Sequence, residues 1–366
     1  MTRRACLGAL ATLALCACIP SVSTSTPPHA AIRPAVTPAP VTAVAVTPSH
    51  SWPVSEDTVE VVSYSPDGTR IATGLADGTV AIWDAAGAPE PLAGDRLHHD
   101  FVSSVAWSPD GRWLATGSTD GEARVYDALL KDVQLRMPTV RYRFVSVCWS
   151  PSGTELAVAR GERSIDVYRP ADAPKDGASL APLYSFVVPG QTTDVAWSHD
   201  GAWIAAGNRL GDVVIASTAS RQVTRTVSHP DWRDVASLAW SPDSSRIAAG
   251  YASGTVVLYD PLTGMVAVTL PLLRQVNAIS WSPNGRLLAT TSLDFKVFFW
   301  SAETGKQVGY SDLGVDVNGL AWSPDGSRLA AGTDGHTLAV FIVGPPQGVA
   351  SGATGVPTWT RSYMPQ

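Results

Sequence analysis

Cysteine, positive charge and long hydrophobic runs are all scarce in this 366-residue sequence. Its four cysteines are Cys6, Cys16, Cys18 and Cys148, and three of them lie within the first 18 residues. The formal net charge is −6 and no basic run occurs, which argues against a nucleic-acid partner because such partners usually require a strongly basic surface. No apolar run reaches the length of a transmembrane helix. Hydrophobic residues nevertheless make up 45% of the chain, enough for a large buried core.

The first 18 residues have the layout of a secretory signal. Arg3 and Arg4 precede a mostly apolar stretch, residues 5–17. Its end, Leu15-Cys16-Ala17-Cys18, resembles the lipobox of bacterial lipoproteins, in which a small residue precedes a cysteine that is lipidated and becomes the new N-terminus. The resemblance implies lipidation at Cys18, because the competing Cys16 follows the bulky Leu15. The alternatives are an ordinary cleaved signal and a short apolar anchor, and either would also export the protein. The two arginines match part of a twin-arginine signal, so the export route stays open.

This interpretation divides the N-terminal region into a signal peptide, residues 1–17, and a lipid-anchored linker, residues 18–40. The linker is rich in Pro, Ser and Thr, a composition typical of an extended tether. Removing the signal would bring the net charge to −8 and leave Cys148 as the one cysteine besides the lipid site. A disulfide framework within the mature chain is thereby excluded.

A short phrase recurs seven times in the remaining chain, at spacings of 41 to 48 residues. In each copy, an aromatic residue and then a serine precede a reference position. An alanine lies six residues after that reference position. The reference positions are Pro66, Pro109, Pro151, His199, Pro242, Pro283 and Pro324. Seven matches in register indicate an internal structural repeat.

Each unit reads as strand, turn, strand, turn, strand. Alternating residues precede a Ser-Pro-Asp-Gly turn, and Gly in such a turn adopts the left-handed conformation. A fourth strand is expected in each variable stretch, for instance over residues 183–188 and 265–270. The sequence therefore predicts seven four-stranded antiparallel sheets.

Sheets of this kind expose two apolar faces, so they are stable only when they stack. In the innermost strand of the last unit, Leu320 and Trp322 share one face while Gly319 and Ala321 share the other. The bulky face of one sheet can therefore pack against the small face of its neighbour. Cys148 belongs to the small series and is expected to be a buried thiol in the place of alanine.

The phrase Ala321-Trp322-Ser323-Pro324-Asp325-Gly326, together with residues 77–84 of the first unit, resembles the WD-repeat family. The resemblance covers residues from about 59 to 342 and implies an all-β fold, a seven-bladed β-propeller. It also implies that the Ser-Pro-Asp-Gly turns lie on one rim and that the turns at Asp77, Asp120 and Asp294 lie on the other.

The family often shows a hydrogen-bond network of His, Ser or Thr, Asp and Trp within a blade. Here the complete network is expected only in the second unit, from His98, Thr116 and Asp120, with Tyr126 in place of Trp. Packing must stabilise the other units.

Closing the ring requires a strand from one chain end. Residues 42–47 could pair with the strand near Phe341, and residues 358–363 are the alternative. The N-terminal closure is preferred, which gives a propeller over residues 41–345 and a tail over residues 346–366.

Catalytic signatures are missing from the sequence. There is no phosphate-binding Gly-rich loop, no nucleophile elbow and no Cys or His set with metal-ligand spacing, and the His98-His99-Asp100 run reads as a solvated loop. The inner strands are expected to present Ser104, Ser146, Ser237, Ala278 and Gly319, with Asp194 and Asn318 as the polar exceptions. We therefore expect no cofactor, no metal and no enzymatic activity.

What remains is the surface of the variable loops that enter each innermost strand. Exposed Trp, Tyr and Arg favour the centres of protein interfaces. The candidate contact residues are Asp57, Asp100, Tyr142, Arg143, Trp232, Arg233, Arg274, Gln275 and Asp316. The sequence favours a monomeric, exported scaffold that binds a protein through this rim, at the cell surface or the periplasmic face of a bacterial membrane. The alternatives are a propeller enzyme (a lactonase-like hydrolase or a quinone-cofactor dehydrogenase) and a structural envelope component.

Overall fold

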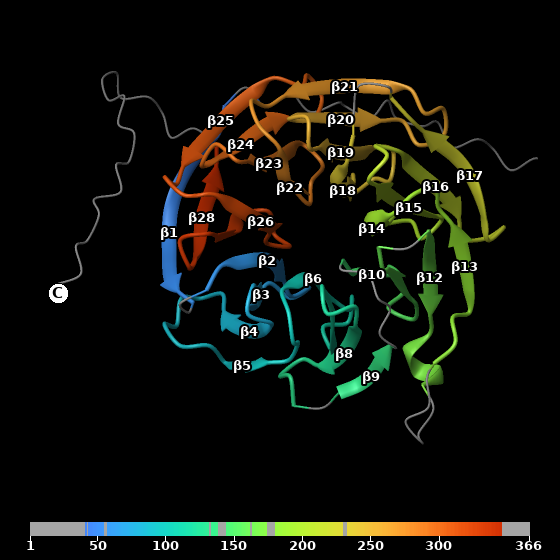
Figure 1. Ribbon diagram of the computed structural model, residues 1–366. Helices are drawn as coiled ribbons and strands as arrows, with labels where there is room; N and C mark the ends of the chain where they lie inside the picture. Colours follow the sequence, from blue (N-terminus) through green and yellow to red (C-terminus); the bar gives the residue numbers. More distant parts are fainter. Residues whose placement is uncertain are drawn as a thin grey trace, which may run out of the picture. The chain divides into compact units, whose positions relative to one another are not determined.

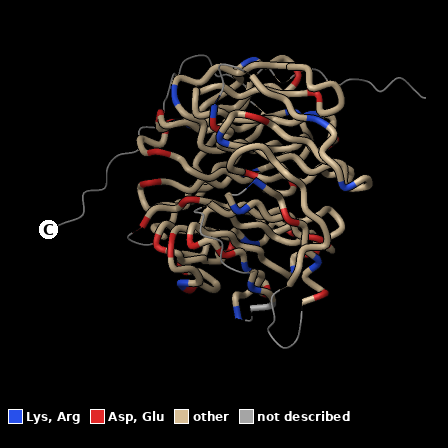
Figure 2. The backbone as a smooth tube through the Cα atoms, turned by 45° about the vertical axis from the view of Figure 1, so that its right-hand side comes forward, with Lys and Arg blue, Asp and Glu red and all other residues tan. Residues whose placement is uncertain are grey.

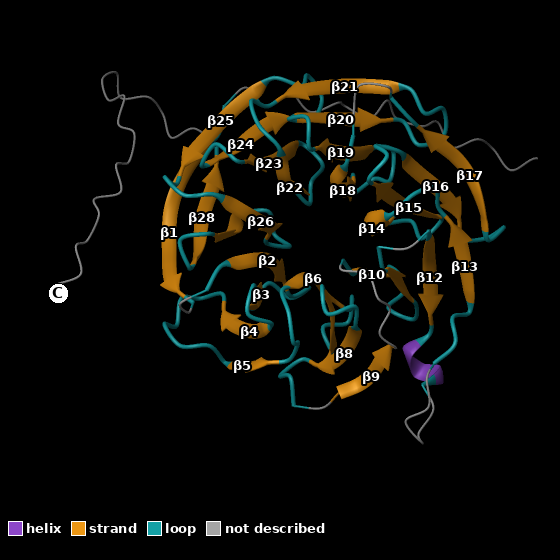
Figure 3. Ribbon diagram, in the orientation of Figure 1, coloured by secondary structure: helices purple, strands orange, loops and turns teal. Residues whose placement is uncertain are grey.

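The computed structural model describes residues 41–345 except residues 42, 55–56, 132, 138–143, 162, 174–179 and 230–232. In this part of the chain, strands β1 to β28 form seven four-stranded antiparallel sheets arranged as blades around a common centre (Figure 1). The predicted seven-bladed β-propeller is confirmed. Strands make up almost all the regular structure, and the short 3-10 helix Pro170–Asp172 is the single helical element among the described residues (Figure 3).

The blades follow one another along the chain, and each runs from an inner strand at this centre to an outer strand. Blade 1 contains β2 (Val59–Tyr64), β3 (Arg70–Leu75), β4 (Thr79–Asp84) and β5 (Ala93–Arg96). Blade 2 contains β6 (Val102–Trp107), β7 (Trp113–Ser118), β8 (Ala123–Asp127) and β9 (Val133–Met137). Blade 3 contains β10 (Ser146–Trp149), β11 (Leu156–Ala159), β12 (Ser164–Tyr168) and β13 (Tyr184–Val187). Blade 4 contains β14 (Thr192–Trp197), β15 (Trp203–Asn208), β16 (Val213–Ser217) and β17 (Gln222–Val227).

The remaining blades repeat this order, and β13 and β21 confirm the predicted fourth strands. Blade 5 contains β18 (Val235–Trp240), β19 (Ile247–Tyr251), β20 (Thr255–Tyr259) and β21 (Val266–Pro271). Blade 6 contains β22 (Val276–Trp281), β23 (Leu287–Ser292), β24 (Lys296–Ser301) and β25 (Gln307–Asp312). Blade 7 contains β26 (Val317–Trp322), β27 (Arg328–Thr333), β28 (Thr337–Gly344) and the N-terminal strand β1 (Ala45–Pro53).

The Ser-Pro-Asp-Gly turns form one rim, which we call the turn rim. In blade 1 the Ser65 hydroxyl donates to Asp67 Oδ1 at 2.6 Å and accepts the Arg70 amide at 2.9 Å, while Gly68 takes φ +72°. A Cβ on Gly68 would lie 3.4 Å from the Pro324 ring of blade 7. Serine, proline and glycine of the phrase therefore close the turn and fit it against its neighbour, which explains why the phrase repeats.

The blades stack as the alternation of large and small residues predicts. Between blades 6 and 7, Trp322 meets Phe299 edge to face with ring centroids 6.0 Å apart, and Ala289 and Leu329 complete the same core cluster. The Trp322 side chain is 7% exposed. Burying an indole of about 150–250 Å² contributes roughly 4–6 kcal/mol before the entropy of ordering the chain is subtracted.

The N-terminal strand closes the ring, as preferred from the sequence. β1 pairs antiparallel with β28, with Pro48 opposite Phe341 and Trp52 opposite Leu338. The strand runs from Ala45 to Pro53, further along the chain than the expected residues 42–47. The longer strand carries Trp52 into the core beside Trp83 of blade 1, at a centroid distance of 6.3 Å. The alternative closing segment, residues 358–363, lies outside the described residues.

Charged residues of both signs are interspersed along the backbone of the described residues (Figure 2). None of the helices in this part of the chain is long and apolar enough to span a membrane.

Candidate functional site

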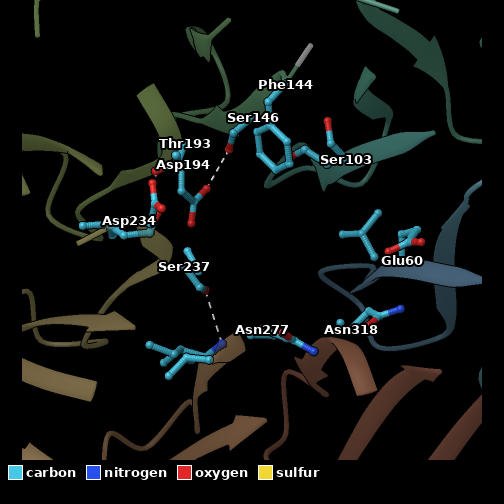
Figure 4. Close-up of a pocket in the computed structure, with 18 of the residues that line it drawn as sticks. Glu60, Ser103, Phe144, Ser146, Thr193, Asp194, Asp234, Ser237, Asn277 and Asn318 are labelled. Atoms are coloured by element: carbon cyan, nitrogen blue, oxygen red, sulfur yellow. Dashed lines mark hydrogen bonds between the residues drawn. The ribbon is translucent and has the colours of Figure 1, made fainter. Parts of the chain in front are cut away.

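A channel of about 700 Å³ runs between the inner strands of the blades. Figure 4 shows polar side chains from several inner strands along its wall, with Asp194 of β14 on one side and Glu60 of β2 on the other. The wall is more polar than the sequence suggested. Besides the expected Asp194 and Asn318, it carries Glu60, Thr193, Asn277 and Ser103.

A β-bulge in the inner strands causes this difference. In β26 the pairing with β27 shifts between Val317 and Gly319, so that Asn318 and Gly319 both line the channel. Equivalent shifts occur in β2, β6, β14, β18 and β22, whereas β10 of blade 3 pairs without one. In a regular strand, successive side chains point to opposite faces, so only one of two neighbouring residues would line the channel. A bulge lets both residues line it. The burial pattern shows the same departure, because Val59 and Val62 are three residues apart and both buried, which strict alternation does not allow.

The first row of polar side chains at the channel joins four successive pairs of blades, from blade 2 to blade 6. Its members lie on the inner strands of blades 2, 3, 4 and 5, and each accepts a backbone N–H of the following blade. The bonds are Val147 N to Ser104 Oγ (3.1 Å), Val195 N to Ser146 Oγ (3.3 Å), Leu238 N to Asp194 Oδ2 (2.7 Å) and Ile279 N to Ser237 Oγ (3.3 Å). These residues were expected at the channel, and the structure assigns them a bridging role.

The second row consists of the residues that the bulge adds, and three of them donate a hydrogen bond to the next blade. Ser103 Oγ bonds the Val145 carbonyl at 2.7 Å, and Asn277 Nδ2 bonds the Val317 carbonyl at 3.1 Å. Thr193 Oγ1 bonds the Val235 carbonyl in the same way. Much of the polar character of the channel is therefore used to hold blades together.

Asp194 has the largest share in this bridging. Its carboxylate accepts from Ser146 Oγ at 2.7 Å, from the Val195 amide at 2.9 Å and from the Leu238 amide at 2.7 Å, and so it connects blades 3, 4 and 5. Burial raises the pKa of Asp194 to about 6, against the opposite effect of these three hydrogen bonds.

Glu60 lies at the centre of an acidic group near the channel mouth. Burial, followed by repulsion from Asp334 and Asp57, raises its pKa to about 7. Asn318 Nδ2 donates to Asp334 Oδ1 at 2.7 Å. Burial and repulsion from Asp334 also raise the pKa of Asp316, while Arg274 opposes the shift.

The rim opposite the turn rim consists of the loops that enter the inner strands, together with the turns between the second and third strands. We call it the loop rim. Of the predicted contact residues, Asp57 and Asp316 are half-buried there, and Asp100, Arg233, Arg274 and Gln275 are exposed. Tyr142, Arg143, Trp232 and the lipidation candidate Cys18 lie outside the described residues.

Some of these predicted residues come together and others do not. Electrostatic interactions link Asp316 to Arg274 and, through Asp334 and Glu60, to Asp57, so that blades 6, 7 and 1 share one charged sector. Asp100 lies in the loop that enters blade 2, and Arg233 lies in the loop that enters blade 5. Asp334 and Glu60 were missed by the sequence analysis because one lies in a turn and the other is placed by the bulge.

The hydrogen-bond network expected in the second unit is present in part, since His98, Thr116 and Asp120 are joined while the Tyr126 hydroxyl lies 3.4 Å from Arg124 Nη1 instead. His98 Nε2 lies 2.8 Å from Thr116 Oγ1, and His98 Nδ1 lies 3.1 Å from Asp120 Oδ2. Blades 1 and 6 keep a fragment of it, in which Trp83 and Trp300 donate to Thr73 and Thr290 at 3.0 and 2.9 Å. His98 thus has a structural role.

The Cys148 thiol and the possibility of a metal site also bear on whether the protein could be catalytic. Burial raises the pKa of the Cys148 thiol to about 11, and its sulfur accepts the Trp197 amide at 3.3 Å, which fits a thiol in a packing position. Within the described residues, no group of three or more His, Cys, Asp or Glu is arranged to hold a metal ion.

Comparison with known families agrees with this architecture. Five stretches of the chain match the family model described as WD domain, G-beta repeat: residues 42–84, 94–127, 221–260, 273–301 and 309–341. These matches support a place in the WD-repeat propeller family, whose fold commonly serves as a protein-interaction scaffold. They leave out the residues between 127 and 221, which contain blade 3 and most of blade 4. A comparison with curated proteins finds no match.

Proposed function

We propose that this protein is a non-catalytic interaction module that binds a partner protein through its loop rim. We further propose that lipid on Cys18 tethers it to the outer face of a bacterial membrane.

One contrast within the ring carries the proposal. Side chains of the channel wall, such as Ser104, Asp194 and Asn277, are engaged in hydrogen bonds between blades. The loop rim instead presents exposed charged and amide side chains, among them Asp100, Arg233 and Arg274. A rigid frame with a varied exposed rim suits recognition of another protein, because little conformational entropy is lost on binding.

The tether is supported by the order of segments along the chain. The linker assigned to residues 18–40 is followed within a few residues by β1, which starts at Ala45 and forms the outer strand of blade 7. A tether at this end would be joined to a strand that pairs with β28 from Ala45 to Pro53, with one register shift between Pro48 and His50.

Site-specific photocrosslinking on intact cells tests the partner claim. A photoreactive amino acid at Arg274 or Arg233 is expected to capture one protein, identified by mass spectrometry. The same residue at Arg112 on the turn rim, a matched exposed arginine, is expected to capture none. Crosslinks from Arg112 alone, or from none of the three positions, would contradict the proposal.

The tether has a separate test. Mass spectrometry of the mature protein is expected to find a diacylglyceryl group on an N-terminal Cys18, and an unmodified terminus at any other residue would exclude it.

A second candidate function is hydrolysis in the channel, which one observation favours. A carboxyl with a pKa of about 7, such as Glu60, is suited to general acid or base catalysis when it borders a cavity. Assays on a panel of lactones and esters test it, with Glu60→Gln as the variant. Turnover that disappears in Glu60→Gln while the thermal midpoint is retained would favour a lactonase-like enzyme over the interaction module.

A further inference from the structure

Two blades carry a large side chain at a backbone position where their neighbours use glycine. The residue that ends the turn between the second and third strands is Gly78, Gly121, Gly211 or Gly254 in four blades, with φ between 84° and 91°. In blade 6 it is Phe295 at φ 66°, and in blade 7 it is His336 at φ 58°. A residue other than glycine in this region costs roughly 1–2 kcal/mol.

The cost at Phe295 is not recovered by burying its ring. The Phe295 side chain is 47% exposed on the loop rim, and its neighbour Leu293 in the same turn is 37% exposed. Leu273, in the loop that enters blade 6, is 91% exposed. An exposed aromatic ring in a strained conformation, accompanied by exposed leucines, indicates a surface kept for contact with another molecule.

Backbone hydrogen bonds hold these segments together. The Leu293 amide donates to the Gln275 carbonyl at 3.2 Å, which joins the turn to the loop containing Leu273. On the other side, the Leu313 amide donates to the Phe295 carbonyl at 2.9 Å. Leu273, Leu293 and Phe295 therefore belong to one sector of the loop rim, which we call the Phe295 patch.

The charges beside this patch are mainly negative. Asp294 lies in the same turn as Phe295 and within electrostatic reach of Asp316, which also interacts with Asp334 and Arg274. The nearby Lys296 is paired with Asp312 at 3.9 Å. Within the described part of the chain, Asp294 and Asp316 each have one buried carboxylate oxygen that receives no hydrogen bond. A cation arriving here would relieve repulsion among the three aspartates.

We infer that the Phe295 patch docks a segment of the partner protein that combines an apolar side chain with a neighbouring lysine or arginine. The apolar side chain covers the Phe295 ring and the leucines, and the cation faces Asp294, Asp316 and Asp334. This inference rests on the proposed function and specifies where the partner binds and what its contact segment contains.

The strained backbone supplies a discriminating variant. Phe295→Gly removes the ring and relaxes the turn, so it is expected to maintain or raise the unfolding free energy while it weakens docking. Misfolding therefore cannot be mistaken for loss of binding. Leu262→Ser is the matched control, because Leu262 is 65% exposed beside Asp260 in a turn between the outer strands of blade 5.

The experiment selects peptides from a random dodecapeptide phage library on the immobilised full-length chain. Enriched peptides are then synthesised with a fluorescent label and titrated with each variant by anisotropy. We expect peptides that carry Lys or Arg next to Leu, Phe or another apolar residue. Their affinity is expected to fall about tenfold or more in Phe295→Gly and about threefold to tenfold in Asp316→Asn, and to stay within about twofold in Leu262→Ser.

Three outcomes would overturn the inference: no enriched peptide, enriched peptides without a cationic residue, or binding that is unchanged in Phe295→Gly. Failure here is distinguishable from failure of the proposed function. If Arg274 still crosslinks a partner in cells that express Phe295→Gly, the loop rim binds a protein by other residues. If no loop-rim position crosslinks, the proposed function fails whatever the peptides do.

Discussion

The junction between blades 3 and 4 and the junction between blades 7 and 1 depart from the pattern of the other five in the same way. Elsewhere the tryptophan of each inner strand donates its indole N–H to the preceding blade, as Trp240 does to the Ala196 carbonyl at 3.1 Å. In blade 4, Trp197 bonds Gly201 of its own turn instead. In blade 1 the residue is Tyr64, whose buried hydroxyl has no partner among the described residues.

The two junctions replace the lost bond by different means. Between blades 3 and 4 the replacement is polar, since Asp194 accepts the Ser146 hydroxyl across the junction. On the turn rim this junction is loose, because a Cβ on Gly201 would find nothing within 4 Å, whereas Gly153 lies against Pro109.

Between blades 7 and 1 the replacement is mainly apolar. Trp52 of β1 is 3% exposed and packs in one cluster with residues of blades 7 and 1. A Cβ on Gly319 would lie 3.0 Å from the Val61 Cα, so the absence of a side chain there brings the two inner strands close. The ring therefore tolerates loss of an indole hydrogen bond where a carboxylate bridge or closer packing is available.

Replacing Trp52 tests the apolar junction and has the largest expected effect. Trp52→Ala is expected to lower the unfolding free energy by about 3–5 kcal/mol, because it leaves a cavity between blades 7 and 1. Urea denaturation measures the change. Thr47→Ala on the exposed side of the same strand is the control, with an expected change under about 0.5 kcal/mol. Equal effects would show that β1 contributes by backbone pairing alone.

Replacing Asp194 tests the polar junction. Asp194→Ala is expected to cost about 2–4 kcal/mol, because the Leu238 amide and the Ser146 hydroxyl both lose an acceptor. Ser237→Ala, at the equivalent position of blade 5, loses one long bond and is expected to cost about 1 kcal/mol. A cost for Asp194→Ala no greater than that for Ser237→Ala would refute a special role for the carboxylate.

Acidification tests one buried carboxyl at each of the two junctions, Asp194 between blades 3 and 4 and Glu60 between blades 7 and 1. The pKa of Asp194 is about 6 and that of Glu60 about 7 in the folded protein, both above their ordinary values. The folded state therefore binds more protons than the unfolded state between about pH 4 and 7, and the unfolding free energy falls as the pH rises through this range. We expect a gain on the order of 1–2 kcal/mol from pH 7.5 to 5.5 by urea denaturation.

Variants locate the source of this pH dependence. Glu60→Gln should flatten the upper part of the profile and Asp194→Asn the lower part, while Trp52→Ala should shift the whole profile without changing its slope. A flat profile in the unmodified protein would contradict the raised pKa values.

The smallest expected effect comes from the hydroxyl of Tyr64. Tyr64→Phe removes a buried group that has no partner among the described residues, so the unfolding free energy should stay the same or rise by up to about 1 kcal/mol. Tyr168→Phe is the contrasting control, because the Tyr168 hydroxyl accepts from Arg160 and its loss should destabilise. Thermal unfolding of the two variants side by side decides the question.

The repeat made the fold predictable from sequence, because the Ser-Pro-Asp-Gly phrase fixes a turn and its flanking alternation fixes two strands. The blade number followed from the repeat, and the contacts of His98 with Thr116 and Asp120 followed from the resemblance to the WD-repeat family. The channel wall did not, since a bulge turns Glu60 and Asn277 toward it against the alternation. The exposed Phe295 was also missed, because its importance lies in a backbone angle that residue type does not reveal.

The ring closure has a consequence for how the protein folds. Ala45 at the start of β1 pairs with Gly344 at the end of β28. The first strand to be synthesised can therefore pair only after the last strand has been made. Contacts this distant in sequence are slow to form, because the whole intervening chain must be ordered before they are gained. Until β28 has been synthesised, β1 has no strand to pair with, and a chain truncated anywhere before residue 337 would lack the strand on which β1 assembles.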